Sequence, residues 1–191
     1  MAVPVRNIRC VVAYDGTDFL GFQRQAGGPT VQGVLEDAIA SLTGEKVRVL
    51  GAGRTDAGVH AAGQVIAFRT GSRIPVERWP YALNSRLPPS VVVQDAAEAP
   101  EGFHPRRDAI AKVYQYTIWN GRFPSPFWGR WALHVPPPLD VDAMARAGAV
   151  LVGRHDFAAF RAAGSTPVKS TVRHLMELVV ERCPQEPRCV R

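Results

Sequence analysis

Length, composition and charge set the first limits on this chain. It has 191 residues, 46% of them hydrophobic, which is enough for a packed core in one large or two small domains and excludes a wholly disordered protein. Its 23 Lys and Arg against 17 Asp and Glu give a formal net charge of +6, which favours a polyanionic partner without establishing one. No apolar run is long enough to span a membrane, and residues 1–6 lack the apolar core of a secretory signal.

The three cysteines predict no metal site. Cys10, Cys183 and Cys189 lack the spacing of zinc ligands, and no histidine cluster follows them. Cys10 falls in an apolar pattern and is expected to pack as a small hydrophobe. A disulfide between Cys183 and Cys189 is conceivable, but nothing in the sequence favours one. We therefore expect a soluble, cytoplasmic protein.

The first half of the chain alternates strand-like and helix-like patterns. Residues Ile8–Tyr14 read as a strand. Thr30 has the residue type of an N-cap, and the apolar residues after it recur at spacings of three and four until Gly44, which predicts a helix. The remaining predicted elements are strands at Lys46–Leu50, Gly63–Phe68 and Val91–Val93, and a helix that begins at Pro75.

A charged link with two prolines, residues 96–108, predicts a domain boundary. We place the domains at residues 1–103 and 104–191. The elements predicted after the link are a strand at Lys112–Trp119, a helix between Asp140 and Gly153, a basic loop at 154–170 and a strand at Val172–Val180. Mixed strands and helices in both halves predict an α+β fold of two side-by-side subdomains with mainly antiparallel sheets.

A glycine-rich turn, Gly51–His60, lies between two of the predicted strands. Its glycines allow backbone conformations that other residues avoid, so the turn can approach a ligand closely. It carries the guanidinium of Arg54, the carboxylate of Asp56 and the imidazole of His60 on a loop held at both ends by strands. Residue types and spacing alone favour a different role for Asp56, in which its carboxylate bonds the backbone of its own turn. A phosphate-binding loop is disfavoured because the terminal Lys-Ser/Thr pair is absent.

Seven motifs occur in one order along the chain and cover it from about Arg9 to Arg182. They are Tyr14-Asp15-Gly16-Thr17, Gly21-Phe22-Gln23-Arg24-Gln25, Gly53-Arg54-Thr55-Asp56-Ala57-Gly58-Val59-His60-Ala61, Asn84 with Leu87-Pro88, Phe103-His104-Pro105-Arg106, Lys112-Val113-Tyr114-Gln115-Tyr116, and His155-Asp156-Phe157 with Phe160-Arg161. In this order they resemble the TruA-type tRNA pseudouridine synthases. The run around Asp56 is the most specific of them.

The resemblance implies a reaction and the residues that perform it. Enzymes of this family break the bond between ribose and a uracil nitrogen, turn the base and rejoin it through carbon, without a cofactor or a metal. They act as homodimers on tRNA, at positions 38–40 of the anticodon stem-loop. The resemblance makes Asp56 the catalytic carboxylate and Tyr114 a contact of the flipped base. For Tyr114, residue type alone favours a half-buried strand aromatic over this role.

Several basic and polar residues are expected to bind the RNA. Arg54 is a candidate for a phosphate contact or for the positive field beside Asp56, and His60 and Arg24 are further candidates for substrate binding. For His60, residue type alone favours a role in fixing its own loop. Other residues that could extend a basic groove are Arg106, Arg107, Lys112, Arg161, Lys169 and Arg173.

Residues 181–191 depart from the family pattern. In relatives, a further strand and helix carry an arginine that pairs with the catalytic carboxylate. We therefore expect a C-terminally truncated relative whose second domain is incomplete and lacks a central strand, and whose Asp56 lacks that guanidinium. Two functions stay open: an active uridine isomerase, or a catalytically inactive RNA-binding fragment of such an enzyme.

Overall fold

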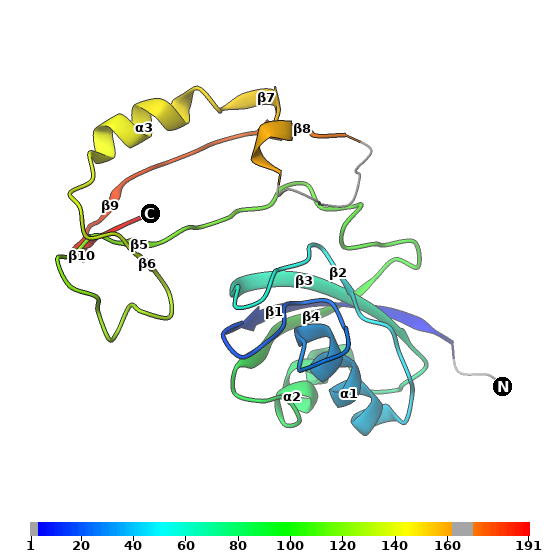
Figure 1. Ribbon diagram of the computed structural model, residues 1–191. Coiled ribbons are helices and arrows are strands. Elements are labelled where there is room, and N and C mark those ends of the chain that lie inside the picture. The colour runs from blue at the N-terminus through cyan, green and yellow to red at the C-terminus, as the bar shows by residue number, and fades with distance from the viewer. Residues whose placement is uncertain (1–3, 162–169) are drawn as a thin grey trace. The chain divides into compact units, whose positions relative to one another are not determined.

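The first sheet is built around strand β1 (Arg6–Tyr14) in the computed structural model, which describes residues 4–161 and 170–191 (Figure 1). The strand order is β2 (Leu50–Gly51), β3 (Ala61–Thr70), β1 and β4 (Val91–Ala99), and every pairing is antiparallel. Ile8 lies opposite Phe68, and Cys10 lies opposite Ile66. These four side chains are buried, which confirms the first predicted strand and its apolar face.

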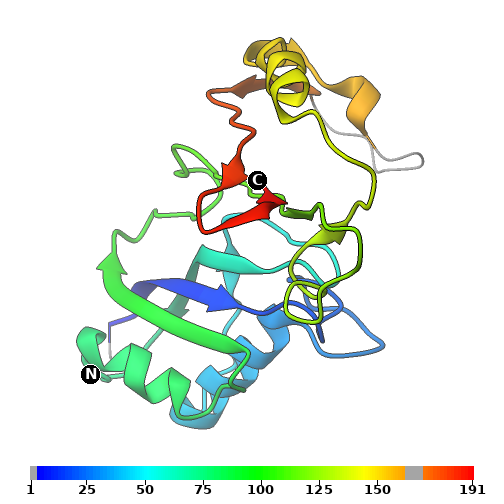
Figure 2. The same ribbon diagram turned by 90° about the vertical axis from the view of Figure 1, so that its left-hand side faces the viewer.

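Two helices lie on the same face of this sheet, as both views show (Figures 1 and 2). They are α1 (Val31–Thr43) and α2 (Trp79–Asn84), and a 3₁₀ turn, Val76–Arg78, precedes α2. Side chains of both helices and of strands β1, β3 and β4 form one apolar core. Its most deeply buried members include Ile8, Val12, Leu35, Ile39, Ile66, Phe68, Trp79, Leu83, Val91 and Val93.

Helix α1 begins and ends where the sequence predicts. The Thr30 side chain accepts the Gly33 N–H at 3.2 Å, and Gly44 closes the helix in the left-handed conformation with φ 74°. The backbone N–H groups of Val31 and Gln32 donate to the carbonyls of Gly21 and Phe22 at 3.2 and 2.9 Å. Two backbone N–H groups at the start of α1, which have no partner within the helix, are therefore bonded to the preceding loop.

Three predicted elements of the first half need correction. Strand β2 covers only Leu50–Gly51, not Lys46–Leu50, because both backbone groups of Val49 bond to side chains of α1. The helix predicted to begin at Pro75 is the 3₁₀ turn followed by the short α2. Strand β4 extends beyond Val93 to Ala99, because β1 offers it a partner along its whole length.

The chain divides into two units, Met1–Lys112 and Val113–Arg191. The second unit contains a sheet in the order β6 (Leu133–His134), β5 (Ile118–Trp119), β10 (Glu186–Val190) and β9 (Arg182–Cys183). Only the β5–β6 pairing is parallel. Strands β7 (Gly153–Asp156) and β8 (Val172–Leu175) form a separate antiparallel pair, and α3 (Val141–Ala149) precedes β7.

The C-terminal residues provide a strand that we expected to be missing. β9 and β10 form a hairpin, and β10 lies between β5 and β9, so the prediction that this sheet lacks a central strand is wrong. Cys183 and Cys189 are both buried within the hairpin as free thiols, with their sulfur atoms 2.7 Å apart.

Other predictions for the second unit were partly wrong. The strand predicted at Lys112–Trp119 is reduced to β5. Val113, Tyr114 and Tyr116 are exposed, and no described strand pairs with this part of the chain. The predicted strand Val172–Val180 ends at Leu175, where its partner β7 begins. β7 itself occupies part of the predicted loop 154–170, of which residues 162–169 lie outside the described part.

Helix α3 has the predicted cap, since the Asp140 side chain accepts the Ala143 N–H at 2.8 Å. The helix ends at Ala149 and not at Gly153 as predicted. Gly153, with φ 111°, is the first residue of β7. Helices and mainly antiparallel sheets make this an α+β fold, as predicted. Among the residues that the model places, no helix is long and apolar enough to cross a membrane.

Candidate active site

The turn predicted to carry chemistry, Gly51–His60, joins β2 to β3 and is anchored on both sides of Asp56. On the β3 side, the Ala52 N–H donates to the Val65 carbonyl at 2.9 Å, and the Gln64 side-chain amide donates to the Gly53 carbonyl at 2.8 Å. Within the turn, the Val59 N–H donates to the Asp56 carbonyl at 3.2 Å. The backbone that presents Asp56 is therefore fixed.

A second loop, residues 15–30 between β1 and α1, packs against this turn. Thr55 is the main point of contact: its carbonyl accepts the Phe22 N–H at 3.0 Å, and its hydroxyl lies 2.9 Å from the Tyr14 hydroxyl. Burial raises the pKa of Tyr14, which keeps that phenol protonated and able to donate. The Gly58 N–H also donates to the Phe19 carbonyl, at 3.3 Å.

Two glycines permit this close approach. A Cβ at Gly16 would collide with the Val59 carbonyl, and one at Gly21 would lie 2.6 Å from the Thr55 carbonyl oxygen. Gly21 also has φ 98°, a conformation that L side chains rarely adopt. The glycines of the Tyr14–Gly21 segment are thus required by contact with the turn that carries Asp56.

The two loops enclose a pocket of about 300 Å³, at the lower end of the range for small-ligand sites. Its lining residues are Leu20, Gln23, Arg24, Gln25, Arg54, Thr55, Asp56 and Ala57. The side chains of Arg54 and Asp56 are exposed and form no hydrogen bond or ion pair, with each other or with any other residue that the structure describes. A carboxylate and a guanidinium therefore meet solvent in the same pocket.

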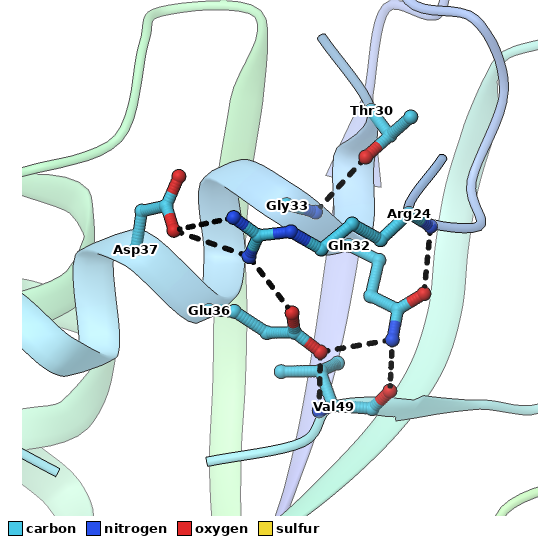
Figure 3. A network of polar contacts seen from close by, with 7 residues as sticks. All are labelled: Arg24, Thr30, Gln32, Gly33, Glu36, Asp37 and Val49. Atoms are coloured by element: carbon cyan, nitrogen blue, oxygen red, sulfur yellow. Dashed lines mark hydrogen bonds and ion pairs between the residues drawn. The ribbon is translucent and has the colours of Figure 1, made fainter. Parts of the chain in front are cut away.

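Arg24 lines the pocket with its side chain already paired. Its guanidinium contacts Glu36 at 3.0 Å and Asp37 at 3.2 Å, and it remains half-exposed (Figure 3). Hydrogen bonds to Glu36 and then Asp37 raise the pKa of Arg24. The guanidinium is consequently held by helix α1 while still open to a ligand in the pocket.

The His60 imidazole contacts the start of the second loop, at residues 15 and 16. Its Nδ1 lies 3.0 Å from an Asp15 carboxylate oxygen and 3.2 Å from the Gly16 nitrogen. The Nδ1 therefore faces one donor, the Gly16 N–H, and one acceptor, the Asp15 carboxylate. The Thr17 hydroxyl and amide bond the same Asp15 oxygen and, with the His60 charge, lower the pKa of Asp15.

One of the predicted basic residues, Lys112, approaches the Asp56 turn from the end of the first unit. The Lys112 ammonium lies 3.5 Å from where a Cβ on Gly53 would be. Burial, and then the nearby charge of Arg106, lower the pKa of Lys112. Lys169 lies outside the described residues. Tyr114 belongs to the second unit, where its side chain is 77% exposed.

A metal centre is not built by the residues described, since nowhere among them do three or more His, Cys, Asp or Glu side chains gather to bind an ion. What the pocket offers is a carboxylate, two guanidiniums and several amide and hydroxyl groups. Such groups can bind a phosphate or sugar and supply a nucleophile or base.

Known proteins match this chain over nearly its full length. Residues 10–107 match a family model described as tRNA pseudouridine synthase. The tRNA pseudouridine synthase A of Brevibacillus brevis is 49% identical over 182 residues, which cover 95% of this chain and 74% of the relative. The chain belongs to the tRNA pseudouridine synthase family.

Two further relatives agree. The tRNA pseudouridine synthase A of Moorella thermoacetica is 51% identical over 92% of this chain and 72% of its own length. That of Geobacter sp. is 47% identical, with 93% and 72% covered. The resemblance predicted from the motifs is therefore confirmed. The region matched to the tRNA pseudouridine synthase model contains Arg24, Arg54, Asp56 and His60, while Tyr114 lies beyond it.

Sequence reasoning missed the residues that support this pocket. Gln32 and Glu36 connect α1 to both loops, and Asp15 holds His60. A signal for the first pair was present: Gln32 and Glu36 stand four residues apart in an otherwise apolar helix pattern, at the spacing of side chains that touch. No such local signal indicates Asp15, which is far from His60 in sequence.

Proposed function

We propose that this chain is a tRNA pseudouridine synthase that isomerises uridine to pseudouridine in the anticodon stem-loop, at positions 38–40, with Asp56 as the catalytic carboxylate. The reaction breaks the bond from ribose C1′ to uracil N1 and forms a bond from C1′ to C5. The hydrogen on C5 leaves as a proton and N1 gains one, so the conversion is redox-neutral. It requires a carboxylate near the sugar, to act as nucleophile or base, and space for a base outside its stack.

The observation that carries the proposal is the state of Asp56. Its side chain is exposed in the pocket and has no internal partner among the described residues, while the turn that carries it is held by hydrogen bonds to strand β3 and to the second loop. An aspartate that merely stabilised the turn would bond the turn's own N–H groups through its carboxylate, and Asp56 does not. A rigidly presented, unpaired carboxylate fits a reacting group.

The other residues receive roles from their positions. Arg54, which lies in the same pocket and has no partner among residues 4–161 and 170–191, is proposed to bind a phosphate or to stabilise the charge of Asp56 during the reaction. Arg24 is proposed to contact RNA from the opposite loop. His60 is proposed to touch RNA from the end of the turn that it shares with Asp56, and Tyr114 to contact the flipped base.

Three finer features accompany the proposal. The first is a division into two α+β subdomains near residue 103, which rests on the charged link at 96–108, with the second subdomain incomplete. The second is a homodimer that binds tRNA, which rests on the family resemblance, and the third is a cytoplasmic location, which rests on the cysteines and on the sequence of residues 1–6. They stay predictions. No cofactor is invoked, because the isomerisation consumes neither an oxidant nor a reductant.

Tritium release from tRNA labelled at uracil C5 tests the assignment. We expect release by the purified chain, and Asp56→Ala should lower kcat by at least about a thousandfold while tRNA is still bound. Asp18→Ala is the matched control, because Asp18 is also an exposed aspartate of the adjoining loop but does not line the pocket. Normal release from Asp56→Ala would rule out the catalytic role.

The alternative function is distinguished in the same experiment. Salt-sensitive tRNA binding without tritium release by the unsubstituted chain would support an inactive RNA-binding module. tRNAs with uridine restricted to one of positions 38, 39 or 40 would then test the proposed site of modification. Release from a tRNA lacking uridine at all three would contradict it.

A further inference from the structure

A polar network at the start of α1 connects the helix to both walls of the pocket (Figure 3). Its centre is Gln32, whose side chain is 9% exposed. The Gln32 side-chain oxygen, Oε1, accepts the Arg24 backbone N–H at 2.8 Å. Its NH₂ group donates to a Glu36 carboxylate oxygen at 2.8 Å and to the Val49 carbonyl at 3.1 Å. Reversing the amide would oppose like groups at all three contacts, so its orientation is fixed.

Glu36 completes the network one helical turn later. Its side chain is 12% exposed, and both carboxylate oxygens are in use. One accepts the Val49 N–H at 3.0 Å together with the Gln32 amide, and the other accepts the Arg24 guanidinium at 3.0 Å. Because a buried carboxylate is costly unless it is well bonded, this arrangement holds its partners in defined places.

The partners of Gln32 and Glu36 belong to two different segments. Arg24 lies between Gln23 and Gln25, which line one wall of the pocket. Val49 immediately precedes β2, which leads into the turn that carries Arg54 and Asp56. Side chains of α1 thus take the place of a strand ladder at Val49 and, at the same time, hold the backbone of the facing loop.

We propose that Gln32 and Glu36 are positioning residues that set the two walls of the Asp56 pocket relative to each other. This inference rests on the proposed function for its effect on catalysis, but not for its effect on the loops. The two side chains are buried behind the pocket and do not line it, so they act through Arg24 and Val49. A wall displaced by about 1 Å can cost a hundredfold in rate, so their loss should be visible in turnover.

Asp37 offers a matched control. Like Glu36 it contacts the Arg24 guanidinium, but it is 68% exposed and bonds neither Val49 nor Gln32. Glu36→Ala and Asp37→Ala therefore each remove one carboxylate from Arg24, while only the first releases the β2 side. Glu36→Gln is the conservative variant, because its amide oxygen can still accept the Val49 N–H.

The test measures tritium release, tRNA binding and thermal unfolding for these variants and for Gln32→Leu, well below their unfolding temperatures. We expect Glu36→Ala and Gln32→Leu to lower kcat by at least about tenfold with a smaller change in KM, Glu36→Gln to recover most of the loss, and Asp37→Ala to stay within about twofold of the parent. Parental kcat in folded Glu36→Ala and Gln32→Leu, or an equal loss in Asp37→Ala, would overturn the proposal.

Amide hydrogen exchange separates this inference from the proposed function. In Gln32→Leu, or in Glu36→Ala if the former does not fold, exchange should accelerate at residues 22–25 and 49–56 but not in the same segments of Asp37→Ala. If the parent chain releases no tritium, the proposed function fails while exchange still decides the positioning role. Unchanged exchange in both segments would end it.

Discussion

The Phe22 N–H donates a 3.0 Å hydrogen bond to the Thr55 carbonyl, directly before Asp56 in the chain. This one bond joins the loop that carries Arg24 to the turn that carries the carboxylate. Gly21, the residue before Phe22, makes it possible by lying against the same carbonyl with a positive φ. The glycine at the start of the Gly21–Gln25 motif therefore has a steric basis in this molecule.

Gly21→Ala is expected to disrupt the site more than its small size suggests. A side chain at φ 98° costs about 1–2 kcal/mol, and the new Cβ would also press on the Thr55 carbonyl from 2.6 Å. We expect the free energy of unfolding in urea to fall by about 2 kcal/mol or more, with lower tritium release.

The matched control for that substitution is Gly27→Ala in the same loop. Gly27 has φ 100°, but its Cβ would meet only a Leu20 methyl group at 4.0 Å. Gly27→Ala should therefore show the backbone cost without the loss of turnover. Equal turnover in the two variants would show that contact between the loops has no role in activity.

Local signals predicted the parts of the fold that depend on local chemistry. Thr30 and Gly44 fix the ends of α1 through their own backbone and side-chain preferences, and both were predictable. Strand lengths were not, because they depend on distant partners: β2 is short since Val49 bonds to α1, and β4 is long since β1 pairs with it throughout. The exposed alternation at Val113–Tyr116 shows that period alone does not make a strand.

The same division applies to the site. The glycine-rich turn and its polar residues were evident from sequence, and Arg24, Arg54 and Asp56 do line one pocket. The contacts that support these residues were not evident, because the partners of Gln32, Glu36 and Asp15 are distant in the chain. The four-residue spacing of Gln32 and Glu36 indicates only that these two side chains touch. A buried glutamine in a helix resembles any surface glutamine until its partners are placed.

Thr30→Ala should destabilise the helix that carries Gln32 and Glu36. The substitution removes the acceptor for the Gly33 N–H, and loss of such a cap costs about 1 kcal/mol. Thr30→Ser keeps the oxygen and should recover most of that loss, which separates capping from packing of the buried methyl group. Urea unfolding measures both variants, and a serine variant as unstable as the alanine one would assign the effect to packing.

Asp15 predicts a specific loss of stability in acid. Its pKa is lowered in the folded chain, first by the Thr17 hydroxyl and amide and then by His60. A lowered folded pKa gives stability that is fully present above the unfolded value of about 4 and is lost as the pH falls through the folded value. Thr17→Val removes the largest cause, so it should lower stability at pH 7 and reduce its decline below about pH 4.

The measurement is urea unfolding of the parent and Thr17→Val from neutral pH down to the acid limit of the folded state. The difference in unfolding free energy between them should narrow as Asp15 is protonated, and Thr17→Ser, which keeps a hydroxyl, should follow the parent. A difference that stays constant with pH would mean that Thr17 acts by packing and not through the Asp15 carboxylate.

Cys10 should resist alkylation in the folded chain. It lies fully buried at the centre of β1, and burial, assisted by Asp95, raises its pKa to about 12. At pH 8 about one thiol in ten thousand would then be ionised, against about a quarter for an ordinary cysteine, and iodoacetamide reacts with the thiolate. Peptide mass spectrometry should find Cys10 unlabelled in native buffer and labelled in urea. The core must open before the reagent reaches this sulfur, so the labelling rate should rise in Gly21→Ala if that substitution destabilises the whole first unit. Labelling of native Cys10 at the rate of a free thiol would contradict its burial.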